Sequence, residues 1–100
     1  MKMDMTFNFL LQATRVLHVN NYDSDELKLI YKYTTSLDND ILNDYYISRT
    51  ILGYNNDLEL YLEIVETLIN IFEEMEDYEK CFVLKNKRDE SLKIINNKNN

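Results

Sequence analysis

The chain has no proline and a single glycine, Gly53, among its 100 residues. Proline and glycine are the residues that most strongly interrupt helices and strands, so their near absence leaves few forced breaks. The ends of elements must then be found from capping residues and from the spacing of apolar side chains. Together these signals predict one all-α domain of four to five helices over residues 1–95.

Apolar residues recur most regularly between positions 57 and 74, at spacings of three and four. Asn56 and Glu59 form a plausible N-terminal cap, and a helix is predicted from Asp57 to Glu74. This helix is apolar on two sides, which is typical of a central helix with neighbours on both sides. The main face consists of Leu58, Tyr61, Leu62, Val65, Leu68, Ile69 and Phe72, and a second stripe of Leu60, Ile64 and Ile71.

A last helix is predicted over residues 78–95, after a short reversal at Met75-Glu76-Asp77 with Asp77 as its cap. A turn this short makes two helices antiparallel neighbours, so the chain should end in an antiparallel helical hairpin. The asparagine-rich residues 96–100 should form a disordered tail. The apolar residues of this last helix are Tyr78, Cys81, Phe82, Leu84, Leu92 and Ile95.

Two shorter helices are predicted earlier in the chain. Asp23 and Glu26 have the spacing of a capping box, which opens a helix over residues 24–35. Asp38 or Asn39 caps the next helix, which is expected to run through Leu52. It should end at Gly53, because glycine adopts the left-handed conformation after a helix at little cost.

The segment 6–19 has two interpretations. Phe9, Ala13 and Leu17 share one face of a helix, whereas Phe7, Phe9 and Leu11 alternate as in a short strand. The helical interpretation is favoured, and the strand remains open.

The chain is poor in the residues from which enzymes build active sites. It has one histidine and one cysteine, and it lacks a glycine-rich phosphate loop, a Glu-x-x-His pair and a calcium-binding loop. His18 has no nucleophile or second ligand nearby in sequence, and Cys81 lies on an apolar face where cysteine usually acts as a small hydrophobe. We therefore expect no catalysis, no metal and no cofactor.

Charge is distributed unevenly along the C-terminal half. Nine acids and no base occur from Asp57 to Glu79, and the net charge of the chain is −7. This charge disfavours direct binding to nucleic acid or to anionic membranes. It favours a protein partner with a basic surface, contacted through Glu59, Glu63, Glu66 and Glu73. The alternative is that acids and bases simply follow the helix dipoles on solvated faces.

Eight tyrosines are the second candidate binding feature. Adjacent tyrosines and those two residues apart cannot all face one core, so some must be exposed. Tyrosine is enriched at protein interfaces, and Tyr33, Tyr46 and Tyr54 are the expected contact residues. A tyrosine-lined nucleotide pocket is a weaker alternative, because no phosphate-binding loop accompanies it. A third interpretation is codon bias, since Asn, Ile, Lys and Tyr have AT-rich codons typical of low-GC genomes.

Residues 73–85 (Glu-Glu-Met-Glu-Asp-Tyr-Glu-Lys-Cys-Phe-Val-Leu-Lys) resemble the helical hairpin of UVR motifs, and also a pattern found in small proteins of low-GC tailed phages. The shared skeleton is an acidic turn followed by Tyr78-Glu79-Lys80-Cys81 and then Leu84-Lys85. Cys81-Phe82 stands where UVR motifs have two alanines, and Lys85-Asn86 replaces their Arg-Asp. The resemblance implies a hairpin that mediates protein–protein contact, in a phage-like protein.

The sequence as a whole predicts a non-catalytic, phage-type accessory protein in the host cytoplasm. It would dock on a host protein through an acidic, tyrosine-containing helical surface and modulate or inhibit that protein. The main alternative is a homo-oligomeric structural or virion-assembly protein, in which the stripe of Leu60, Ile64 and Ile71 forms the subunit interface.

Overall fold

The computed structural model of the chain describes residues 2–19, 22–48 and 55–98, with side chains for 9–19, 22–48 and 55–97. These ranges contain helices and no strand, which confirms the all-α prediction and places segment 6–19 in a helix. The helices are α1 (Lys2–His18), α2 (Ser24–Thr35), α3 (Asn39–Ile47), α4 (Asp57–Glu74) and α5 (Tyr78–Lys98). Residues 96–98, expected to lie in a disordered tail, continue α5.

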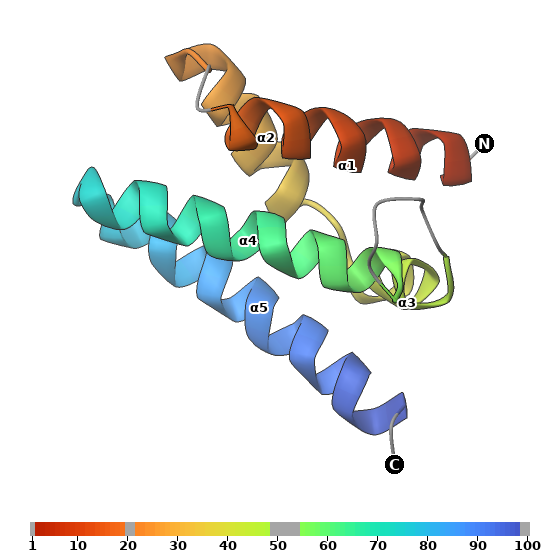
Figure 1. Cartoon of the computed structure of the whole chain (residues 1–100). Helices are drawn as coiled ribbons and strands as arrows, with labels where there is room; N and C mark the ends of the chain where they lie inside the picture. Colours follow the sequence, from red (N-terminus) through yellow and green to blue (C-terminus); the bar gives the residue numbers. More distant parts are fainter. Residues whose placement is uncertain (1, 20–21, 49–54, 99–100) are drawn as a thin grey trace.

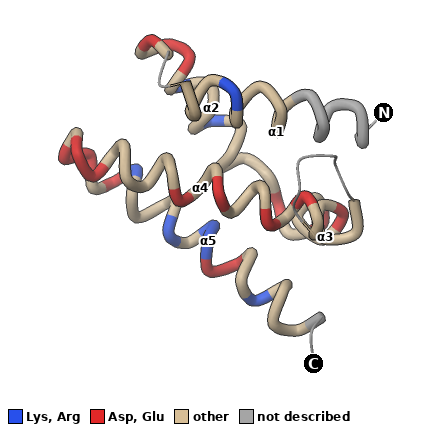
Figure 2. Tube along the Cα trace, viewed as in Figure 1, with Lys and Arg blue, Asp and Glu red and all other residues tan. Residues whose placement is uncertain are grey.

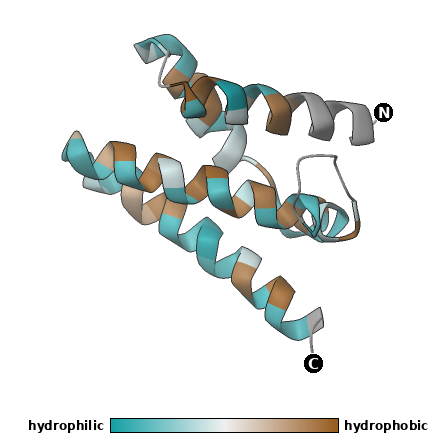
Figure 3. Ribbon diagram, in the orientation of Figure 1, coloured by the Kyte–Doolittle hydropathy of each residue, from teal (hydrophilic) through white to brown (hydrophobic). Residues whose placement is uncertain are grey.

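The longest apolar helix, α4, lies at the centre of the domain. Figure 1 shows it between α1 and α5, with α3 beside its N-terminal end. Nine of its 18 residues are buried, and brown apolar positions recur along it in Figure 3. The central position predicted from two apolar faces is therefore confirmed.

Burial of α4 overturns one part of the assembly hypothesis. Leu60 is fully buried and Ile64 is 2% exposed, both within the domain's own core, while Ile71 is half-buried against it. The neighbouring helices already cover this second stripe, so it is not exposed for a subunit interface. Its apolar character reflects the central position of α4.

Capping side chains set the starts of three helices as the sequence predicted. The carboxylate of Asp23 accepts a hydrogen bond from the Glu26 amide at 2.8 Å, and the Glu26 side chain accepts one from the Asp23 amide at 3.2 Å. This reciprocal pair is a capping box. Asp38, one of the two residues proposed for α3, accepts from the Ile41 amide, and Asn56 accepts from the Glu59 amide, each at 3.0 Å.

The end of α3 differs from the prediction. The helix ends at Ile47, because Ser48 adopts an extended backbone (φ −75°, ψ 152°). The Ser48 carbonyl accepts a hydrogen bond from the Asp57 amide at 2.9 Å, which ties the end of α3 to the start of α4. A helix continuing to Leu52 would have used that carbonyl internally. Leu52 and Gly53 lie outside the described residues.

The turn between α4 and α5 has the hydrogen bonds of a Schellman motif. The Glu76 amide donates to the Glu73 carbonyl at 3.0 Å, and the Asp77 amide donates to the Phe72 carbonyl at 2.9 Å. This motif needs a left-handed residue after the helix, usually glycine. Here Glu76 takes that conformation, with φ 59°.

The two helices joined by this turn pack closely and antiparallel, as predicted. The Cys81 thiol lies 3.7 Å from the Ile69 carbonyl oxygen, to which it donates a hydrogen bond. Leu84 and Ser91 of α5 are fully buried. Ile95 is half-buried against the core, whereas three other predicted apolar residues of α5 are exposed: Tyr78 by 66%, Phe82 by 67% and Leu92 by 41%.

Candidate functional site

The acids predicted to form one surface follow one stripe of α4, at spacings of four, three and seven, but two of them are neutralised by bases of α5. Glu66 pairs with Arg88 at 3.3 Å and Glu73 with Lys85 at 3.4 Å, both across to α5. The carboxylate of Glu59 accepts a hydrogen bond from Asn55 at 3.4 Å. These contacts are consistent with a solvated helix face more than with a dedicated binding surface.

Glu63, the fourth predicted acid, lies on the side of α4 that faces α1. It lines a small depression together with Thr14, Leu17 and His18. His18 itself is exposed at the end of α1. Glu63 therefore lies apart from the ion pairs that Glu66 and Glu73 make with α5.

The predicted tyrosines, by contrast, are not brought together. Tyr33 is 41% exposed and stacks on Phe9, with ring centroids 4.8 Å apart. Tyr46 is half-buried against the core, and Tyr54 lies outside the described residues. Tyr45 and Tyr61, by contrast, are core residues in edge contact at 5.9 Å.

Exposed apolar and acidic side chains do coincide at the turn between α4 and α5. We call residues 73–83 the hairpin tip. Met75 is 58% exposed there, and Val83 is 37% exposed, next to the exposed rings of Tyr78 and Phe82. Figure 2 shows the acids gathered at this end of the hairpin; they are Glu73, Glu74, Glu76, Asp77 and Glu79.

Lys80 neutralises one of these acids and organises the aromatic side of the tip. Its Nζ lies 2.8 Å from Asp77, and this hydrogen bond lowers the pKa of Asp77 and raises the pKa of Lys80. The same Nζ lies 5.6 Å from the ring centroid of Tyr31 and 5.8 Å from that of Phe72, within cation–π range. Burial is the main cause that raises the pKa of Tyr31.

A shallow hollow of about 620 Å³ opens beside this arrangement. Tyr31 of α2 forms one wall, and the other lining residues are Tyr78, Glu79, Lys80, Phe82 and Val83 at the start of α5. Among the described residues, Glu74, Glu76 and Glu79 are exposed and have no side-chain ion pair. The tip thus offers an apolar hollow with uncompensated negative charge around it.

The conformation of Glu76 adds a second distinguishing feature to the tip. A left-handed backbone costs a non-glycine residue roughly 1–2 kcal/mol. Its carboxylate is exposed in the turn and contributes to the local negative charge. Strained backbone is more frequent at functional sites than elsewhere.

Sequence reasoning missed the exposure of Phe82 because it counted all apolar residues of the last helix together. Cys81, Leu84 and Ser91 lie on one face at helical spacings of three and seven, and the structure buries all of them. Phe82 is adjacent to Cys81 and must point about 100° away from it. That one-residue offset was the available signal.

Cys81, the one cysteine of the chain, is buried at 3% exposure. Burial raises the pKa of the Cys81 thiol, and the nearby Glu73 carboxylate raises it further, so little reactive thiolate forms at neutral pH. In the described ranges, no three His, Cys, Asp or Glu residues are grouped to hold a metal ion. No helix there is both long and apolar enough to cross a bilayer.

No protein-family model, curated protein or solved structure matches this chain.

Proposed function

We propose that the protein is a non-catalytic binding module that docks on a basic surface of another protein through its hairpin tip. The observation that carries this proposal is the coincidence of exposed Met75, Tyr78 and Phe82 with the exposed carboxylates of Glu74, Glu76 and Glu79, which have no ion pair among the described residues. Large aromatic side chains supply contact area and binding energy at interfaces. Surrounding charge of one sign accelerates encounter with an oppositely charged partner and selects it.

The resemblance of residues 73–85 to UVR hairpins supports the same surface. Those residues include the whole tip, and in UVR motifs the hairpin contacts other proteins. The UVR-like sequence and the compositional bias also support a phage-type accessory protein that acts in the host cytoplasm. Its binding would modulate or inhibit a host protein, for example by occupying a cationic groove that otherwise holds nucleic acid.

A pull-down from a nuclease-treated lysate of the source or host cells tests this proposal. The bait is the full chain, compared with a Tyr78→Ala/Phe82→Ala tip variant and an Ile47→Ala/Leu92→Ala control. The control removes exposed apolar side chains elsewhere, since Ile47 is 75% exposed and Leu92 41%. One dominant host protein should be retained by the wild type and the control and lost from the tip variant. Equal recovery on all three baits would overturn the proposal.

The electrostatic part is tested separately on the partner so identified. A Glu74→Gln/Glu76→Gln/Glu79→Gln variant should weaken binding at least tenfold, mainly through slower association that depends on salt. A charge-matched Asp40→Asn/Asp44→Asn/Glu63→Gln control, exposed on α3 and α4, should stay within twofold. If both variants lose the same affinity, overall charge rather than the tip is responsible.

The homo-oligomeric alternative requires an interface other than the stripe of Leu60, Ile64 and Ile71. With Leu60 and Ile64 buried, an assembly would have to use side chains that remain exposed, and light scattering after gel filtration distinguishes it from a monomer. A small-molecule role is tested by thermal shift with nucleotides. A ligand at 100 times its dissociation constant adds about 2.7 kcal/mol to the free energy of unfolding.

A further inference from the structure

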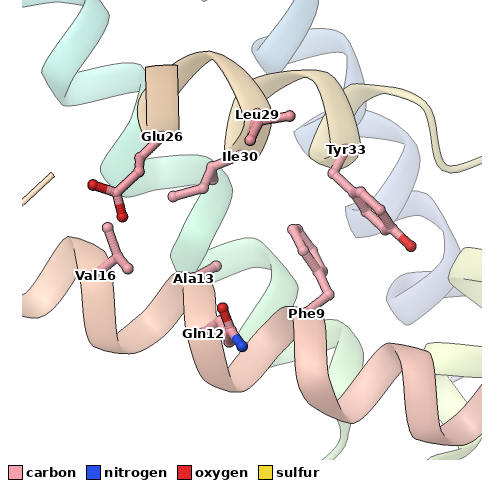
Figure 4. A pocket seen from close by; sticks show the side chains of 8 residues that line it. All are labelled: Phe9, Gln12, Ala13, Val16, Glu26, Leu29, Ile30 and Tyr33. Carbon is pink, nitrogen blue, oxygen red and sulfur yellow. The ribbon is translucent and has the colours of Figure 1, made fainter. Parts of the chain in front are cut away.

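A second open site lies between α1 and α2, away from the hairpin tip. It is a groove of about 420 Å³ between the two helices. Figure 4 shows the side chains of Phe9, Ala13 and Val16 on α1 facing those of Ile30 and Tyr33 on α2. Gln12, Glu26 and Leu29 complete the lining, so six of the eight side chains are apolar or aromatic.

The groove exists because small and large residues alternate along it. Ala13, the only alanine in the chain, is 2% exposed and forms a shallow floor at the middle. At one end, the stacked rings of Phe9 and Tyr33 are nearly parallel, with an interplanar angle of 22°, and bridge the two helices. Leu29 is 66% exposed, which leaves an apolar rim in contact with solvent.

The length of the groove fits a helix better than a small molecule. Phe9 and Val16 are seven residues apart, which corresponds to about 10.5 Å along α1. Partner helices that lie in such grooves present apolar side chains at positions i, i+3 or i+4, and i+7, over the same length. Small-molecule sites instead bury most of the ligand's surface in a cleft or cavity. This groove is open along its length, and its polar residues are Gln12 and Glu26.

The two ends of the groove differ in charge. Glu26 is the single charged residue among those that line it, and it lies at the end opposite the Phe9–Tyr33 stack, near Val16 (Figure 4). Its Oε1 accepts the hydrogen bond from the Asp23 amide, which holds the carboxylate at this end. Asp23 and Asp25 at the start of α2 add two further carboxylates, against the one arginine, Arg15, in the last turn of α1, so the charge at this end favours a cation.

We propose that the α1–α2 groove binds an amphipathic helix of a partner protein. The helix inserts apolar side chains at i, i+3 or i+4, and i+7 along Ala13 and Ile30, and a lysine or arginine beyond one end of this series pairs with Glu26. The groove uses no residue of the hairpin tip. Failure of either proposal therefore leaves the other intact.

A displayed library of 20-residue amphipathic helices, selected against the full chain, tests the groove. Core positions vary among apolar residues and flanking positions between Lys and Glu. Enriched peptides should carry three apolar anchors with a basic residue beyond one end. A matched peptide with proline at its centre should not bind. Failure to enrich any peptide, enrichment of peptides with acids at both ends, or binding by the proline peptide would overturn the proposal.

Variants of the chain then locate the peptide. Leu29→Glu should weaken binding at least tenfold. The control is Ile47→Glu, which introduces the same charge at an exposed aliphatic residue outside the groove and should change binding less than twofold. Glu26→Gln should weaken binding about threefold or more while α2 keeps its cap, since glutamine also serves in a capping box. Insensitivity to Leu29→Glu would overturn the proposal. So would concentration-dependent dimerisation that Leu29→Glu abolishes, because the occupant would then be a second copy of the chain.

Discussion

The α4–α5 and α1–α2 pairs are both antiparallel, and each joins consecutive helices, yet one is closed and the other is open. In the α4–α5 pair, Cys81 and Leu84 are buried and side chains pair across the helices. In the α1–α2 pair, contact is made at the Phe9–Tyr33 stack, and a groove of about 420 Å³ remains beside it. The difference concerns what each helix is anchored to.

In the α4–α5 pair the two helices are each other's main partner. In the other pair, each helix is held by an element outside the pair: α1 packs on α4, and α2 packs on α5. The Tyr61 hydroxyl on α4 also donates to the Thr34 carbonyl of α2 at 2.6 Å. Because α1 and α2 are positioned by other elements, their facing side chains need not fill the space between them. Two amphipathic helices next to each other in sequence can therefore leave a docking groove.

Truncating a buried side chain between α4 and α5 should have the largest effect on stability. Leu84→Ala should lower the free energy of unfolding by about 2–5 kcal/mol, because it empties a fully buried position. Leu29→Ala, at the rim of the open pair, should change it by less than about 0.5 kcal/mol. Urea unfolding followed by circular dichroism measures both. Equal losses would show that the α1–α2 pair is as tightly packed as the hairpin.

Removing the tie between α4 and α2 should have an intermediate effect. Tyr61→Phe leaves the Thr34 carbonyl without this donor in a buried setting, and should cost about 1–2 kcal/mol. Tyr78→Phe, an exposed tyrosine on α5, is the control and should cost almost nothing. If hydrogen exchange in α2 is unchanged by Tyr61→Phe, the tie does not position that helix.

Relaxing the turn of the closed pair should increase stability. Glu76→Gly should raise the free energy of unfolding by about 0.5–1 kcal/mol, because relief of the left-handed strain, roughly 1–2 kcal/mol, exceeds the cost of the greater freedom that glycine has in the unfolded chain. Glu74→Gly, two residues earlier in the last turn of α4, should lower it by up to about 1 kcal/mol. Chemical denaturation of the two variants gives the signs. A loss in both would contradict the strained turn.

The smallest effect is expected from the ion pair at the start of α5. The Lys80 hydrogen bond lowers the pKa of Asp77, so its stabilisation is present above the ordinary pKa of aspartate, about 3.9, and is lost as pH falls through the lowered value. Asp77→Asn keeps a capping side chain and should be slightly less stable at pH 7. The difference should vanish at pH values below the lowered pKa of Asp77, in unfolding curves recorded from pH 7 downward. A difference that persists there would assign the effect to the cap.

Local signals in the sequence predicted the helices well where a cap and an apolar series agreed. The bounds of α2 and α4 follow from Asp23 with Glu26 and from Asn56 with Glu59, which act within a few residues. The end of α3 depends on a hydrogen bond from the Asp57 amide, nine residues away, to the Ser48 carbonyl. No pattern inside α3 encodes that contact.

The candidate sites were harder to predict than the helices. The acidic character of the C-terminal half was visible, but the pairing of Glu66 with Arg88 depends on how α4 and α5 align, which leaves the tip as the uncompensated part. Tyr33 was correctly expected to be exposed. Its stacking on Phe9 follows from the positions of α1 and α2 in space, and the groove beside it follows from the same positions.

Because Cys81 is buried, its reaction with a thiol reagent can be used to measure the opening of the α4–α5 hairpin. It is the single cysteine among 100 residues, so a thiol reagent can react at one place, and the residue is 3% exposed where α5 packs on α4. Labelling must then wait until α5 separates from α4, and its rate under native conditions measures the free energy of that separation. Comparing the rate with and without a bound partner would show whether docking at the tip stiffens or loosens the hairpin behind it, without any engineered probe.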